Sequence, residues 1–233
     1  MCYNIQTSIF SFLTAITSGI VAIKLNQNIL GSLILCYGLM QLSEILIWRG
    51  INTNNNKLNK IGTFIGKYTL PSHNIAIGIG IIITYWDSKN KPIYWLPLII
   101  GLIFYFSIII FYHYNSNKYN GISKACEYEK IDKKTNIECT KYSARLKWGY
   151  PHDWYILSLL ISIIIAFTYI NPLNISIICT SFFVILFGFV ILFGKNQIIG
   201  SWWCWSTSFL SPIIVTIIFF YTLKLSKNTE IRI

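Results

Sequence analysis

Seven apolar runs, each of about twenty residues, dominate this sequence and restrict what it can fold into. They cover residues 6–24, 29–48, 68–86, 93–113, 154–172, 175–194 and 202–223. A helical run of about twenty residues matches the roughly 30 Å hydrocarbon core of a bilayer. Because backbone groups left unpaired in lipid are costly, such runs must be helical. We therefore predict an all-α integral membrane protein, in which residues 1–233 form a single transmembrane domain of about seven helices.

Charged residues are scarce and lie mainly between these runs. Asp, Glu, Lys and Arg make up 12% of the chain, against about 25% in soluble domains. Seven of the eight tryptophans lie at or near run ends, as in the aromatic belts of membrane proteins. A nucleic-acid-binding protein would instead carry a continuous basic patch on a soluble fold. We therefore expect the lipid bilayer as a partner and no nucleic acid.

The distribution of basic residues predicts the orientation. With seven crossings, the N-terminus shares one side of the membrane, called side A, with segments 49–67, 114–153 and 195–201. Side A carries 13 of the 19 Lys and Arg residues. Because cytoplasmic loops are enriched in Lys and Arg, we place side A and the N-terminus in the cytoplasm.

The polar loop 114–153 on side A contains Cys126 and Cys139, which flank the polar stretch 132–136. This pattern suggests a short hairpin with the two cysteines roughly opposite each other. A disulfide between them would require an oxidising compartment. We favour two reduced thiols, because the charge rule is the more general one.

The second run carries Gln41, Glu44 and Trp48 on one helix face, at positions i, i+3 and i+7. An ionisable residue inside a membrane span is expensive and by default marks a functional site. The alternative is a glutamate that snorkels or bonds a neighbouring helix. His73, expected in the first turn or so of the third helix, is a candidate proton carrier or metal ligand, or simply a satisfied interfacial residue.

The seventh run opens with Ser201–Ser206, which holds three tryptophans in four residues. Trp203 is a candidate pocket wall, although an aromatic belt is the simpler explanation. Cys204 is a candidate ligand or nucleophile, but an unassisted thiol is usually inert. Helix direction places these residues near side A together with Glu44 and His73. Since a through-pore would need polar residues along its whole length, we predict a polar cavity open to one side.

Three short motifs of the chain resemble motifs of other proteins. The chain begins Met1-Cys2-Tyr3-Asn4, followed by Thr7-Ser8. Its second run reads Met40-Gln41-Leu42-Ser43-Glu44-Ile45-Leu46-Ile47-Trp48, and Ser201-Trp202-Trp203-Cys204 opens the seventh. These motifs resemble those of an uncharacterised family of multi-pass membrane proteins found in bacteria and in large DNA viruses. That family has Met-Cys-Phe-Ser, then Gln-Gln-x-x-Glu-Gly-x-x-Trp, then Ser-x-Trp-Cys.

The resemblance implies no known activity. Asn4, Met40 and Ile45 replace the Ser, Gln and Gly of the family motifs, and the lost Gly removes the expectation of a close helix contact there. With the bias toward residues encoded by AT-rich codons, the chain looks most like a member from a large virus.

Our leading functional prediction is a protein that binds or translocates a small solute or ion without a cofactor. Glu44 would be its charged centre, with Gln41 and His73 as hydrogen-bond or proton partners. Trp48 and Trp203 would form the walls of the cavity.

Two other functions remain open. One is an intramembrane enzyme or a metal site built from Cys2, Glu44, His73 and Cys204, since these ligand types suit zinc or another transition metal. No spaced metal motif or recognised catalytic motif accompanies them. The other is a structural or receptor-like membrane protein without chemistry.

Overall fold

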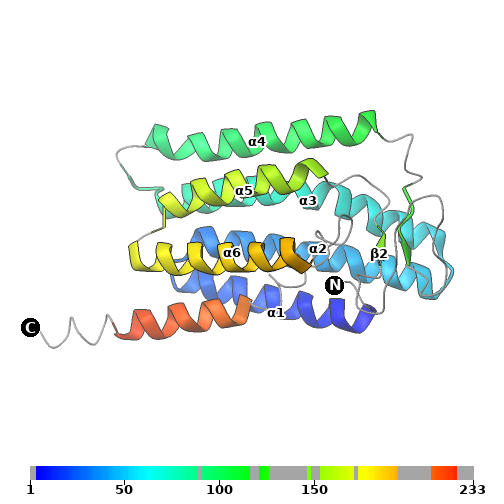
Figure 1. Ribbon diagram of the computed structural model, residues 1–233, viewed down its shortest axis with the longest axis horizontal. Helices are drawn as coiled ribbons and strands as arrows, with labels where there is room; N and C mark the ends of the chain where they lie inside the picture. The colour runs from blue at the N-terminus through cyan, green and yellow to red at the C-terminus, as the bar shows by residue number, and fades with distance from the viewer. Residues whose placement is uncertain are drawn as a thin grey trace, which may run out of the picture.

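The computed structural model describes residues 4–88, 91–115, 121–125, 146–147, 153–170, 173–193 and 211–224. The helices are α1 (Ile5–Lys24), α2 (Asn28–Asn52), α3 (Asn56–Thr84), α4 (Lys91–Tyr114), α5 (Asp153–Thr168), α6 (Leu173–Phe193) and a further helix over Ser211–Lys224. Their axes run along the long axis of the molecule, and consecutive helices run in opposite directions (Figure 1). The predicted helical class is confirmed.

Among the residues that the structure describes, three helices are long and apolar enough to cross a membrane. They are α1, α2 and the Ile93–Tyr114 part of α4. The outer surface has the character of a lipid-facing one, because large apolar side chains are exposed along it. On α4 these residues recur every three or four positions: Leu96, Ile99, Ile103, Phe106 and Ile110. A water-soluble monomer rarely exposes such a continuous apolar stripe.

Helices α1, α2 and α3 form two tight antiparallel hairpins. Asn26 and Asn54, in the two turns, adopt left-handed φ values of 59° and 51°, which asparagine tolerates better than most residues. Glycines let α2 and α3 approach closely. A Cβ at Gly62 would lie 2.8 Å from the backbone nitrogen of Ile47, and one at Gly80 would lie 2.6 Å from the Cα of Ile29.

Helix α3 begins at Asn56, so the prediction that it starts at residue 68 is wrong. The side chain of Asn55 caps the helix by accepting a hydrogen bond from the Leu58 amide at 3.1 Å. Over the added turns Asn59, Gly62, Thr63 and Gly66 are buried at helical spacing, because they pack against α2. At about 1.5 Å per residue, the 29 residues of α3 span about 43 Å, more than a hydrocarbon core.

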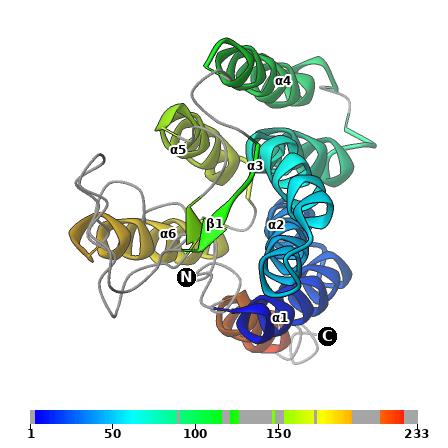
Figure 2. The same ribbon diagram turned by 90° about the vertical axis from the view of Figure 1, so that its right-hand side faces the viewer.

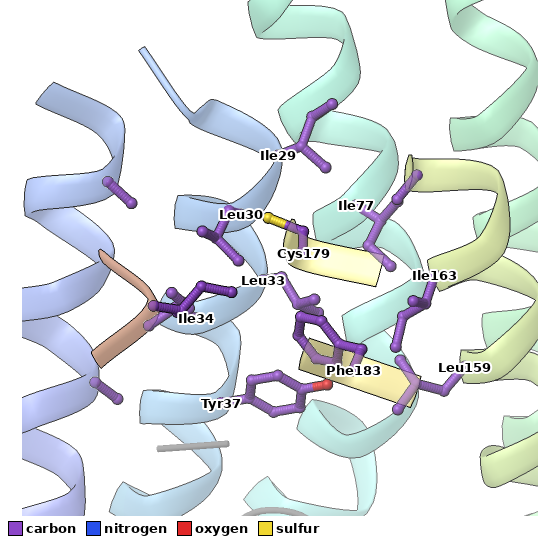
Figure 3. Close-up of a cluster of buried hydrophobic side chains, with 14 of the residues drawn as sticks. Ile29, Leu30, Leu33, Ile34, Tyr37, Ile77, Leu159, Ile163, Cys179 and Phe183 are labelled. Atoms are coloured by element: carbon purple, nitrogen blue, oxygen red, sulfur yellow. The ribbon is translucent and has the colours of Figure 1, made fainter. Parts of the chain in front are cut away.

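Helix α3 is also the centre of the assembly, since it packs against α2, α4 and α5 (Figure 2). The apolar core lies beside its C-terminal half. Figure 3 shows the side chains that converge there from α2, α3, α5 and α6: Leu30, Leu33, Ile77, Leu159, Ile163, Cys179 and Phe183. The site described below is therefore built on one half of α1–α3, while the other half is packed with apolar side chains.

The described parts of the segment between α4 and α5 lie at the end of the bundle where α1 begins (Figure 1). Its described parts form the antiparallel pair β1 (Lys124–Ala125) and β2 (Leu146–Lys147), in which Ala125 faces Leu146. Cys126 and Cys139, and with them the predicted cysteine hairpin, lie outside the described residues.

Candidate functional site

A buried polar stripe runs along α2 toward its C-terminal end. Tyr37, Gln41, Glu44 and Trp48 recur at intervals of three or four residues and so share one helix face. Gln41 and Glu44 are each 1% exposed and Trp48 is 6% exposed. The same face carries Leu30, Leu33 and Ile34 in the other half of the helix. The helix therefore changes from an apolar to a polar buried face along its length.

Glu44 is the only acidic residue between the N-terminus and Asp87, and α1 covers it. The hydroxyl of Ser8 donates a hydrogen bond to Oε2 of Glu44 at 3.4 Å. Helix α1 approaches closely because its buried residues are small and recur every three or four positions: Ser8, Ser11, Ala15, Ser18 and Ala22. The contact places the glutamate between two helices, away from the apolar outer surface.

Two N–H-bearing nitrogens of this stripe and one hydroxyl of α1 have no hydrogen-bond partner among the described residues. They are Nε2 of Gln41, Nε1 of Trp48 and Oγ of Ser11. Buried polar atoms are usually hydrogen-bonded, and leaving one unsatisfied costs about 1–3 kcal/mol. These atoms therefore identify the α1–α2 contact as the part of the structure best suited to a polar ligand.

His73 lies deeper in the bundle than Glu44. It is fully buried, its ring centroid lies 4.4 Å from that of Tyr37, and its Nδ1 bonds the carbonyl of Leu70 at 2.5 Å. Tyr37 precedes Glu44 by seven residues, which is about 10 Å along α2. The structure thus joins Ser8 to Glu44 and sets His73 about two turns away. The prediction that His73 lies in the first turn or so of the third helix is wrong, because α3 starts at Asn56.

In the helical turn around Pro71, side chains donate hydrogen bonds to backbone carbonyls. Ser72 donates to the carbonyl of Thr69 at 2.6 Å, and Asn74 donates to the carbonyl of Pro71 at 3.2 Å. Proline has no amide hydrogen, so the carbonyl of Lys67 cannot receive the usual helical bond from residue 71. Side-chain bonds to neighbouring carbonyls hold the shape of α3 at this missing bond.

Asn74 also connects α3 to α5. It donates to Oγ of Ser158 at 3.2 Å and accepts from Oγ of Ser162 at 2.7 Å. All three side chains are buried. This network is satisfied within the protein, so it is better suited to holding the two helices together than to binding a ligand.

A second satisfied network lies at the end where α3 begins. Asn59 donates to the carbonyl of Ser123 at 2.8 Å and accepts from its amide at 3.0 Å. The hydroxyls of Thr63 and Ser123 lie 2.8 Å apart. These contacts dock the start of the long loop onto α3, close in sequence to the hairpin that carries Trp48.

No family model, curated protein or solved structure matches this chain.

Part of the predicted site lies outside the described residues, namely Cys2, Trp203 and Cys204. In the part of the chain that the structure describes, no three His, Cys, Asp or Glu residues group closely enough to hold a metal ion. The four-residue metal set and the wall formed by Trp203 therefore stay predictions.

Sequence reasoning missed several buried polar residues, above all Asn59, Asn74 and Ser123. It noted Ser8 as a packing residue and a motif position but did not pair it with Glu44. The spacing of small and polar residues at 59, 62, 63 and 66 was a signal for the extra turns of α3. The contacts across helices had no such signal, because they depend on how the hairpins are aligned.

Proposed function

We propose that the chain is a multi-pass membrane protein with a seven-helix bundle, and that it binds or translocates a small solute or ion. The site would be the polar stripe of α2 where α1 covers it. Glu44 would be its charged centre, with Gln41 and Trp48 on either side on the same face.

The observation that carries this proposal is the burial of Glu44, which is 1% exposed beside α1. Outside the bundle, the surface at this depth is apolar, with Ile9, Phe10 and Leu13 exposed on α1. A carboxylate in such surroundings is costly unless hydrogen bonds, a proton or a positive charge accompany it, and by default it marks a functional site. A site that exchanges a cation, a protonated solute or a proton meets this requirement.

Orientation and family are part of the same proposal. The excess of basic residues on side A supports a cytoplasmic N-terminus, and the site would then open toward the cytoplasm. The proposed kinship with the bacterial and viral family rests on the sequence motifs, of which two positions, Ser8 and Glu44, are in contact here.

The test is uptake and binding by the purified chain in proteoliposomes. The probes are radioactive sodium and rubidium, a pH-sensitive dye for protons, and a labelled mixture of amino acids. We expect at least one probe to bind or enter, and Glu44→Gln to abolish this. The matched control is Asp87→Asn, which makes the same chemical change at an exposed position after α3. If no probe depends on Glu44, or if both variants lose activity equally, the proposal is refuted.

Metal analysis of the same preparations separates this proposal from the transition-metal alternative. Stoichiometric zinc or another transition metal in the wild type that is lost in Glu44→Gln would favour the metal site. Metal content that is equal in the two preparations would favour the solute or ion site.

A further inference from the structure

Two pairs of polar residues lie at matching levels along the α1–α2 contact. Ser8 is level with Glu44, because their side chains bond at 3.4 Å. Seven residues further along α1, Ala15 is level with Gly38, since a Cβ added there would lie 3.4 Å from that of Ala15. In an antiparallel pair, three residues forward on one helix match three residues back on the other. Ser11 is therefore level with Gln41, one turn deeper than Ser8 and Glu44.

All four side chains are removed from the surface. Ser11 is fully buried, and Ser8, Gln41 and Glu44 are each 1% exposed. Oγ of Ser11 and Nε2 of Gln41 have no hydrogen-bond partner among the described residues. Unsatisfied polar atoms on both helices at one level are an observation separate from the buried carboxylate, and they too indicate a ligand.

The available atoms define the chemistry of that ligand. The two serine hydroxyls, the carboxamide oxygen of Gln41 and the carboxylate of Glu44 are all hard oxygen donors. Rotation of the Gln41 carboxamide by half a turn exchanges its oxygen and nitrogen. Oxygen donors of this kind favour hard cations over zinc or copper, which prefer nitrogen and sulfur.

The charge of the set limits the valence of the ion. Glu44 is its only acid, so the set carries one negative charge when the carboxylate is ionised. Calcium sites normally combine several carboxylates. We infer that the oxygen set of Ser8, Ser11, Gln41 and Glu44 binds a monovalent alkali cation, with sodium as the probe. This inference rests on the proposed function, because it names the ion of the same site.

Thermal unfolding of the purified full-length chain in detergent tests this inference. The melting temperature is measured in sodium chloride and in choline chloride at equal ionic strength. Sodium at about ten times its dissociation constant should raise the melting temperature by roughly 3 °C. Ser11→Ala should lose this shift while still folding, because the hydroxyl it removes has no partner in the described part of the protein.

The matched control is Ser18→Ala, which removes a buried hydroxyl from the same face of α1 two turns away. It should keep the sodium-dependent shift. Equal melting temperatures of the wild type in the two salts overturn the inference, and so does a shift that Ser11→Ala retains. If Glu44-dependent uptake of another probe occurs without any sodium shift, this inference fails and the proposed function stands. If neither occurs, both fail.

Discussion

Replacing Asn59 by alanine is expected to release the loop after α4 from α3. The Asn59 side chain is 3% exposed and takes part in three hydrogen bonds with Ser123 and Thr63, at 2.8, 3.0 and 3.2 Å. Only the two bonds to Ser123 hold the loop, because Thr63 lies in α3 itself. At about 1 kcal/mol for each of these two bonds, the substitution removes about 2 kcal/mol from the docked state. This corresponds to roughly a 30-fold increase in the equilibrium constant for local opening.

Hydrogen–deuterium exchange at the Ser123 amide measures this opening. In Asn59→Ala we expect exchange to accelerate by roughly 30-fold. Amides of α2 near Ile34 serve as an internal reference for global unfolding. Thr53→Ala is the control, because Thr53 is exposed at the same end and bonds only locally, to the carbonyl of Arg49. Unchanged exchange in Asn59→Ala, or equal acceleration in both variants, would show that the network does not hold the loop.

Three further substitutions test the packing that positions the site. Gly50→Ala would put a Cβ 2.5 Å from the backbone nitrogen of Asn59, so we expect a loss of about 1–3 kcal/mol and a lower melting temperature; unchanged stability would contradict this close contact. Ser162→Ala removes the 2.7 Å bond to Asn74 and should cost about 1 kcal/mol in chemical unfolding, whereas a neutral effect would argue against the α3–α5 network. Tyr85→Phe loses a hydrogen bond to a backbone carbonyl at the end of α5 and should lower the melting temperature by roughly 3 °C; an unchanged value would mean that ring stacking alone suffices there.

The sequence predicts the bounds of a helix well where the whole helix is apolar. The apolar runs at 6–24, 29–48 and 93–113 became helices that begin and end within four residues of the predicted bounds. The start of α3 did not follow, because hydropathy detects only segments that suit lipid. Its first turns are polar, and they are specified by the Asn55 cap and by small residues that pack on α2.

The sequence predicts which site residues share a face of α2, but it does not predict which residues of α1 contact them. The period of an α-helix already places Gln41, Glu44 and Trp48 on one face. The partner of Glu44 could not be read from that period, because the Ser8 contact depends on the alignment of the α1–α2 hairpin, which the turn at Asn26 helps to set. The position of His73 along α3 was predicted wrongly because the start of the helix was predicted wrongly. With the helix starting at Asn56, His73 lies well inside it.

The missing backbone bond at Pro71 has a mechanical consequence. Helix α3 has 29 residues and lacks one backbone hydrogen bond near its middle. Asn59 fastens the long loop on one side of it, and Asn74 fastens α5 on the other. Because α3 lacks one backbone hydrogen bond there, we expect its two halves to tilt relative to each other more readily than those of an unbroken helix, while Asn59 and Asn74 keep their partners.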